Sequence, residues 1–153
     1  MMITMAERAD LERILALQYL AYQSEARLLN NFAIPPLREN VEDLLRQFEG
    51  GVVFLKAADE DATLVGSVRA RLDQNTVHIG KLMVHPDRQG RGVGTQLLAA
   101  VESVMAKTCP QARYELFTSS QSLRNVRLYV RAGYRPVREE EAAPGLRLIF
   151  LEK

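Results

Sequence analysis

Three alternating glycines, Gly90, Gly92 and Gly94, follow an apolar stretch that ends at Val84 and lead into an amphipathic helix pattern that begins at Val93. Glycine lets the backbone bring consecutive N–H groups close to a ligand. A helix start adds unpaired N–H donors and the positive end of the helix dipole. The stretch therefore predicts a cradle for a phosphate or pyrophosphate group.

Two common phosphate-binding loops do not fit this stretch. The P-loop needs Gly-Lys followed by Ser or Thr, and neither combination occurs in the chain. The dinucleotide fingerprint G-x-G-x-x-G would need glycine where Thr95 or Leu97 stands. The preceding strands also look antiparallel, which is the wrong context for that fingerprint. Both loops are therefore excluded.

A third pattern, Q/R-x-x-G-x-G, matches the residues from Gln89 to Gly94 directly after a strand that ends in Val84-His85-Pro86. This segment resembles the acyl-coenzyme A loop of the GNAT superfamily of N-acetyltransferases. The resemblance extends over nearly the whole chain, because the expected order of strands and helices also agrees. The alternative is a glycine-rich turn that serves packing alone.

The resemblance implies acetyl-CoA as acetyl donor and assigns its binding groups. Its pyrophosphate is assigned to the backbone of Gln89, Gly90, Arg91, Gly92, Val93, Gly94 and Thr95. Leu82, Met83 and Val84 would pair with the pantetheine arm as if it were an added strand. In the family two strands splay apart to admit this arm, and a bulge near Val84 would do so. The Val84 N–H would then stabilise negative charge on the thioester oxygen.

A second signature lies in the helix expected over residues 122–132, where Asn125 and Tyr129 share one face. With Gly133-Tyr134 after them, they resemble the other conserved pattern of the family. The resemblance implies that Asn125 contacts the pantetheine arm or its strand. It also implies that Tyr129 gives a proton to the departing thiolate. The alternative for Tyr129 is a core residue with a satisfied hydroxyl.

Arginines form a stripe on the same expected helix, at Arg124, Arg127 and Arg131. They could meet the 3′-phosphate of coenzyme A. The favoured interpretation is a solvated basic face that contributes little to binding.

A proton acceptor is required because an alkyl amine, with a pKa of about 10.4, is protonated at neutral pH. The first candidate is His78, which alternation places on the same strand face as Leu82 and Val84. The resemblance supports it, since a carboxylate or histidine on this strand often acts as base in the family. Glu115 on the next strand and ordered water are the other candidates. The alternative for His78 is a half-buried structural histidine.

The acceptor amine is expected to bind near the first two helices. Glu25 would attract a cationic amine there, and Tyr22 would stack on it. A solvated helix face is the favoured alternative for both residues.

The elements that must position these groups follow from period and turn residues. Strands are expected at 3–7, 52–57, 63–72, 76–84, 114–118, 134–139 and 146–151, and helices at 10–29, 40–48, from 93 toward 110 and at 122–132. The order is β-α-α-β-β-β-α-β-α-β-β. It predicts an α/β (α+β) fold with one domain over residues 1–153, in which helices cover both faces of a mixed, mostly antiparallel sheet.

Composition excludes several classes of function. The 153 residues are 47% hydrophobic and 25% charged, as in globular proteins, and the net charge is +1. No nucleic-acid or membrane partner is therefore expected. The single cysteine, Cys109, permits no zinc site and no intrachain disulfide, and we expect no metal. With no targeting segment visible, we expect a cytoplasmic protein, and the resemblance implies a homodimer.

Together these observations predict an N-acetyltransferase that moves the acetyl group of acetyl-CoA directly to a primary amine of a small molecule. Two alternatives stay open. One is a non-catalytic acyl-CoA-binding module that acts as a sensor or interaction domain. The other is an enzyme that acetylates an amine of a protein or of an aminoacyl-tRNA.

Overall fold

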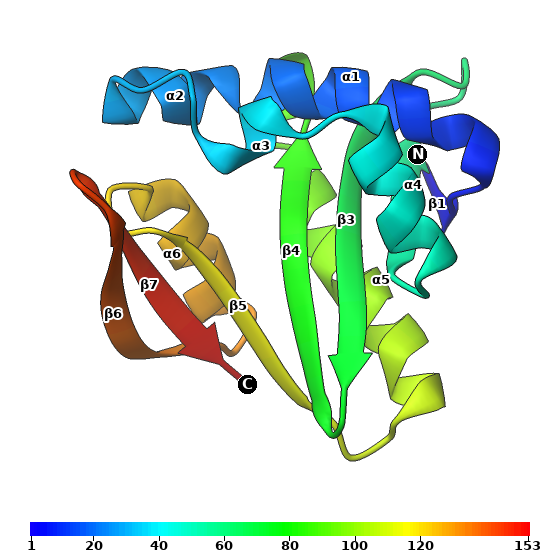
Figure 1. Ribbon diagram of the computed structural model, residues 1–153. Helices are drawn as coiled ribbons and strands as arrows, with labels where there is room; N and C mark the ends of the chain where they lie inside the picture. The colour runs from blue at the N-terminus through cyan, green and yellow to red at the C-terminus, as the bar shows by residue number, and fades with distance from the viewer.

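A central sheet of seven strands, in the order β1-β2-β3-β4-β5-β7-β6, organises the computed structural model, which describes residues 1–153 (Figure 1). The strands are β1 (Met2–Met5), β2 (Val53–Ala58), β3 (Leu64–Asp73), β4 (Thr76–Val84), β5 (Arg113–Ser119), β6 (Arg135–Ala143) and β7 (Leu146–Glu152). All neighbours are antiparallel except β4 and β5. The expected mixed sheet, the parallel crossover and the element order from β2 onward are confirmed, whereas the segment between β1 and β2 forms four α-helices in place of the expected two.

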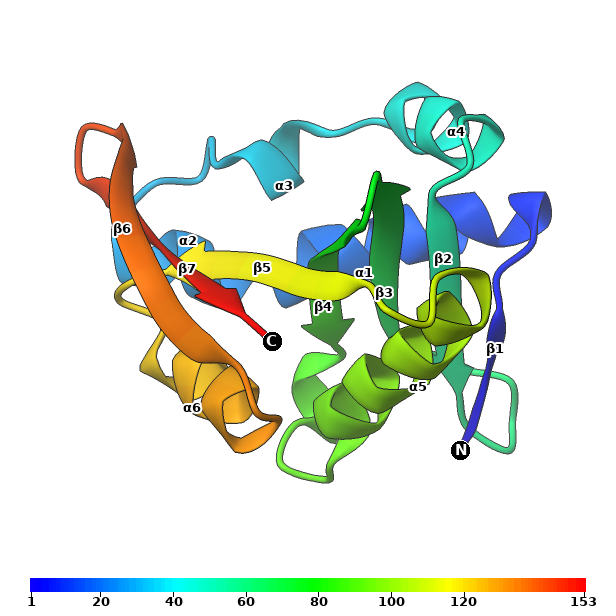
Figure 2. The same cartoon turned by 90° about the horizontal axis from the view of Figure 1, so that it is seen from below.

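Helices cover both faces of this sheet, α5 and α6 on one side and the first four helices on the other (Figure 2). They are α1 (Leu11–Ala21), α2 (Gln23–Leu29), α3 (Pro35–Arg38), α4 (Val41–Glu49), α5 (Val93–Thr108) and α6 (Leu123–Arg131), with short 3₁₀ turns η1 (Arg8–Asp10) and η2 (Pro86–Arg88). None of these helices has the length and apolar composition that a membrane span requires.

The first helix differs from its expected form, because the backbone at Tyr22 breaks it into α1 and α2. Asp10 directly precedes α1, but its side chain makes no cap hydrogen bond there. Its carboxylate instead accepts the Glu7 N–H at 2.7 Å and pairs with Lys56 at 2.8 Å. These hydrogen bonds are favoured over a cap bond to α1, because the bond to Lys56 involves a charged ammonium group.

Two clusters of buried side chains form the core, one on each face of the sheet. The larger lies under α5 and α6 and includes Val68, Val77, Leu97, Val101 and Leu151. The smaller lies under α1 and α4 and includes Leu11, Ile14, Leu44, Phe54 and Met83. Burial of both apolar faces fixes the sheet between the two helix layers.

The sheet opens between β4 and β5. These parallel strands pair over three residue pairs, from Thr76–Arg113 to His78–Glu115, and then diverge (Figures 1 and 2). Beyond that point β5 pairs with β7, and the corresponding edge of β4 has no strand beside it. The splay expected from the resemblance is confirmed, and it leaves main-chain groups of β4 free for a ligand.

An extra residue on β4 produces a β-bulge opposite β3. Ser67 is registered with Met83 and Arg69 with Gly80, so two residues of β3 span three of β4. Lys81, within the bulge, has a φ of 50°, in the left-handed region. A bulge of this kind bends its strand and increases the local twist. It therefore turns the end of β4 away from β5.

The bulge also exchanges the two faces of β4. Before it, Ile79 packs in the larger core; after it, Met83 packs in the smaller core on the opposite face. Leu82 and Val84 now face the larger core, while His78 faces the other side. The expectation that His78 shares a face with these two residues is therefore wrong, because simple alternation ignores the inserted residue. The bulge itself lies earlier on the strand than the position beside Val84 that we expected.

The close packing of α5 on β3 yields a stability prediction. A Cβ on Gly66 would lie 2.7 Å from Leu97 Cδ1 and 3.0 Å from the Met83 carbonyl oxygen. Gly66→Ala is therefore expected to lower the free energy of unfolding by about 1–3 kcal/mol in urea denaturation. Gly80→Ala is the control, because a Cβ there meets nothing within 4 Å. Equal effects of the two substitutions would contradict this description of the packing.

Candidate functional site

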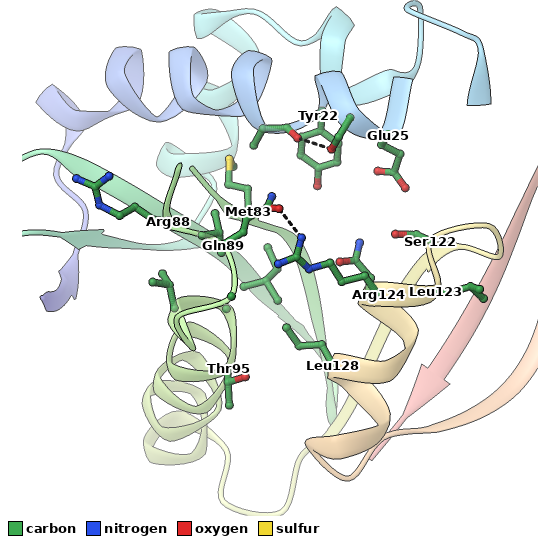
Figure 3. A pocket seen from close by; sticks show the side chains of 18 of the residues that line it. Tyr22, Glu25, Met83, Arg88, Gln89, Thr95, Ser122, Leu123, Arg124 and Leu128 are labelled. Atoms are coloured by element: carbon green, nitrogen blue, oxygen red, sulfur yellow. Dashed lines mark hydrogen bonds between the residues drawn. The ribbon is translucent and has the colours of Figure 1, made fainter. Parts of the chain in front are cut away.

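A cleft of about 670 Å³ lies between α2, the end of β4, the start of α5, and α6 (Figure 3). It contains most of the residues singled out from the sequence, although they come from separate parts of the chain. Those that line it are Tyr22, Glu25, Leu82, Met83, Val84, Gln89, Gly90, Gly92, Val93, Gly94, Thr95 and Asn125. Arg91, Tyr129, His78 and Glu115 are not among its lining residues.

The start of α5 provides unpaired donors at one end of the cleft. Gly90 and Gly92 have φ values of 78° and 80°, which favour glycine, and Gly92 caps the helix without a side chain. The first backbone bond of the helix runs from the Gln96 N–H to the Gly92 carbonyl at 3.0 Å. The N–H groups of residues 93–95 therefore have no partner within the helix and form the expected anion cradle.

Helix α6 forms the opposite wall and approaches α5 closely. A Cβ on Gly94 would lie 3.1 Å from Leu128 Cδ1 and 3.6 Å from a Val84 methyl group. Asn125 Nδ2 donates to Thr118 Oγ1 at 3.3 Å, which ties α6 to β5. A larger side chain at position 94 would therefore widen the cleft between α5 and α6.

The basic side chains near the anion cradle differ in whether they already have an acidic partner. Arg124 Nη1 donates to Gln89 Oε1 at 2.5 Å across the cleft (Figure 3), and Arg131 also lines the cleft. Arg88 is already paired with Asp59 at 2.9 Å. All three α6 arginines are exposed, as the favoured interpretation of a solvated face expects, and Arg124 and Arg131 also border the cleft.

Main-chain groups of β4 face the gap in the sheet. The His85 N–H donates to the Val65 carbonyl of β3 at 2.8 Å. Because donors and acceptors of an antiparallel strand alternate in direction, the N–H and C=O of Val84 point away from β3. They point to the side where β5 has diverged. Val84 is thus placed to donate to a group inserted between the strands.

Tyr129 lies behind the cleft with its ring in the larger core, 6% exposed and packed edge-on against Tyr134. The Tyr134 hydroxyl donates to Glu102 at 2.8 Å, whereas the Tyr129 hydroxyl makes no hydrogen bond within the chain. Burial and the negative charge of Glu25 raise the pKa of Tyr129. The hydroxyl therefore stays protonated at neutral pH and is a proton donor without a partner.

Tyr22 and Glu25 enter the cleft from the opposite side, at the junction of α1 and α2 and in α2 (Figure 3). Burial raises the pKa of Glu25 and, together with the charge of Glu25, also that of Tyr22. The favoured expectation of a solvated helix face is therefore wrong for both. The break at Tyr22 redirects α2 over the cleft, and a continuous helix pattern does not reveal it.

His78 and Glu115 lie at the vertex where β4 and β5 separate. His78 Nδ1 is 3.9 Å from Glu115 Oε1, and the same oxygen lies 3.6 Å from Arg138 Nη2. The register pairs the two residues directly. The structure thus brings both predicted bases together, but outside the lining of the cleft.

A buried polar network that the sequence analysis missed holds the first helices on the sheet. Arg69 Nη1 donates to Glu39 at 3.0 Å and to Gln47 at 3.2 Å, and Gln18 Nε2 donates to Glu39 at 2.8 Å. Burial alone would raise the pKa of Glu39, but these partners lower it overall. The four residues come from four segments, so no local spacing could have shown their contact.

A family model for the acetyltransferase (GNAT) domain matches residues 30–153. Among curated proteins, the UPF0157 protein YqkA of Bacillus subtilis is 30% identical over 135 residues, which are 88% of this chain and 37% of that protein. Mycothiol acetyltransferase of Nocardiopsis dassonvillei is 38% identical over 96 residues, which are 61% of this chain and 28% of that protein. The chain spans about a third of the length of these relatives.

Solved structures share the fold at low sequence identity. They include a ribosomal-protein-alanine N-acetyltransferase from Brucella melitensis (TM-score 0.78, 20% identity, 100% of this chain and 99% of that one). The PaiA N-acetyltransferase from Thermoplasma acidophilum, in complex with coenzyme A, has a TM-score of 0.76 and 17% identity over 100% of both chains. A phosphinothricin acetyltransferase from Sinorhizobium meliloti, in complex with acetyl-CoA, has a TM-score of 0.79 and 17% identity over 99% of this chain and 86% of that one. With the family match over residues 30–153, the chain belongs to the GNAT acetyltransferase domain family.

Proposed function

We propose that this chain is an N-acetyltransferase that moves the acetyl group of acetyl-CoA directly to a primary amine of a small molecule, within a ternary complex. The observation that carries the proposal is the open start of α5, which lies in one cleft with the free edge of β4. Relatives solved with acetyl-CoA or coenzyme A, and one named mycothiol acetyltransferase, support the donor and the reaction.

The donor fits the cleft at three points. The backbone N–H groups from Gln89 to Thr95 hold its diphosphate, and the free edge of β4 from Leu82 to Val84 pairs with its pantetheine arm. Acetyl-CoA supplies the electrophilic carbonyl and the thiol leaving group. The Val84 N–H stabilises the charge that develops on the carbonyl oxygen. Asn125, held by Thr118, fixes the opposite wall beside the arm.

Proton transfers are divided between the two sides of the cleft. Tyr129 lies behind the lining of the cleft, and its protonated, unpartnered hydroxyl protonates the departing sulfur through ordered water. Glu25 attracts the cationic acceptor beside Tyr22. His78 and Glu115 lie outside the lining, so transfer to either would run through ordered water. A non-catalytic acyl-CoA module would need the loop but not the free Tyr129 hydroxyl, which favours the enzyme.

The proposed reaction is tested by incubating the chain with acetyl-CoA and a panel of polyamines, amino acids, aminoglycosides and peptides. We expect at least one amine to release free thiol at a rate proportional to enzyme concentration. Absence of thiol release with every amine, in a protein that binds acetyl-CoA, would overturn the proposed acetyltransferase activity and favour the non-catalytic acyl-CoA-binding module.

Arg124 and Arg127 provide a matched test of the donor site. Arg124 lines the cleft and bonds Gln89, whereas Arg127 lies on the same helix outside it. Arg124→Gln is expected to weaken acetyl-CoA binding about 5-fold in titration calorimetry, since an exposed charge contributes up to about 1 kcal/mol. Arg127→Gln should leave the affinity unchanged. Equal losses in both variants would place the cofactor elsewhere or reduce the effect to general charge.

Tyr129 and Tyr134 provide a matched test of the general acid. Tyr129→Phe is expected to lower turnover about 100-fold while the dissociation constant for acetyl-CoA is kept, because only the proton donor is removed. Tyr134→Phe removes a hydroxyl that bonds Glu102 in the same core, so it should affect stability rather than turnover. Thiol release and calorimetry measure both. Full turnover in Tyr129→Phe would exclude this tyrosine as the acid.

A further inference from the structure

Glu25 is the one carboxylate among the residues that line the cleft. Its side chain points from α2 into the cleft toward α6, next to Tyr22 (Figure 3). The start of α2 follows directly on the break at Tyr22, which directs this turn of helix over the end of β4. Glu25 therefore faces the region where the proposed reaction places the thioester and the acceptor.

No group of the chain neutralises this carboxylate, which forms no ion pair and accepts no hydrogen bond within the chain, and whose pKa burial alone shifts. The other acidic candidates are engaged. Glu39 is held by Arg69 at 3.0 Å, and Glu115 lies beside His78 and Arg138. A half-buried carboxylate without a partner is unfavourable, and such positions are typical of functional sites.

The surroundings of Glu25 make its carboxylate a better proton acceptor than an exposed glutamate. Burial raises its pKa, and its charge in turn raises the pKa of Tyr22 and of Tyr129. The other titratable and charged groups that line the cleft are Tyr22, Arg88, Arg124 and Arg131, and Tyr129 lies behind it. Arg88 pairs with Asp59, Arg124 bonds Gln89, and none of the three arginines forms an ion pair with Glu25.

We propose that Glu25 binds the ammonium group of the acceptor and takes its proton, which makes it the general base of the reaction. This inference rests on the proposed function and names a catalytic residue for it. An N–H bond of the ammonium breaks, an O–H bond forms on Glu25, and the freed lone pair attacks the thioester carbon. The C–N bond forms and the C–S bond breaks.

The proton balance closes without another reactant. Tyr129 gives its proton to the sulfur and regains one from the acetylated nitrogen, while Glu25 releases its proton to solvent. The net products are the amide, the free thiol and one proton. The roles are separated because Glu25 has a lower pKa than Tyr129, so it is ionised at a pH where the tyrosine is not.

The kinetic test compares Glu25→Gln with Glu12→Gln, an exposed glutamate on α1. Glu25→Gln is expected to lower kcat about 100-fold or more at pH 7 with an unchanged dissociation constant for acetyl-CoA. In the wild type, kcat falls as the pH drops through the raised pKa of Glu25, because only the carboxylate accepts a proton. In Glu25→Gln this acidic limb of the pH–rate profile disappears. There, kcat rises about tenfold per pH unit, in proportion to the fraction of unprotonated amine. Glu12→Gln should match the wild type.

Thermal unfolding provides a readout independent of activity. A carboxyl whose folded pKa is raised stabilises the fold while protonated, and this contribution is lost as the pH rises through the folded pKa. The ionised Glu25 therefore lowers stability at pH 7. Glu25→Gln should raise Tm at pH 7 and have little effect at pH 4, whereas loss of a structural contact would lower Tm at both.

The outcomes separate the inference from the proposed function. Thiol release by the wild type with an unchanged kcat and acidic limb in Glu25→Gln would overturn the role of Glu25 and leave the acetyltransferase intact. A lower Tm with weaker acetyl-CoA binding in Glu25→Gln would also overturn it, in favour of a structural role. Absence of thiol release by the wild type with every amine would remove both.

Discussion

The interrupted pairing of β4 and β5 is the constraint on which the site depends. After three residue pairs the strands diverge, and β5 completes its hydrogen bonds with β7 instead. A strand edge within a sheet leaves N–H and C=O groups that need partners. The bulge at Lys81 maintains this opening, because it turns the end of β4 and directs Val84 into the gap. In the proposed function, the extended, amide-bearing arm of acyl-CoA completes this edge.

The start of α5 provides the second half of the same site. Glycines with positive φ replace a capping side chain, so the first N–H groups of the helix stay open toward the cleft. The close approach of α6 at Gly94 then places Asn125 on the opposite wall, with Tyr129 in the core behind it. In the proposed function, anion binding and strand pairing therefore occupy one cleft and the proton donor lies behind it, as transfer from a long phosphorylated donor requires.

The sequence predicted the features that depend on local pattern. The glycine loop, the N-x-x-x-Y pair and the order of elements follow from spacing within single segments, and the structure places the loop and Asn125 in one cleft. Features that depend on tertiary structure were missed. Because of the inserted residue at Lys81, His78 lies on the face of β4 opposite Leu82 and Val84. The break at Tyr22 directs Glu25 into the cleft. The homodimer stays a prediction.

The proposed function depends on main-chain donors of two separate segments that hold one acyl-CoA molecule. Titration of the ¹⁵N-labelled chain with coenzyme A, followed by amide NMR, reports on these donors individually. We expect saturable binding with the largest amide shifts at residues 93–95 and 82–84. Absence of binding, or shifts confined to other parts of the chain, would contradict it.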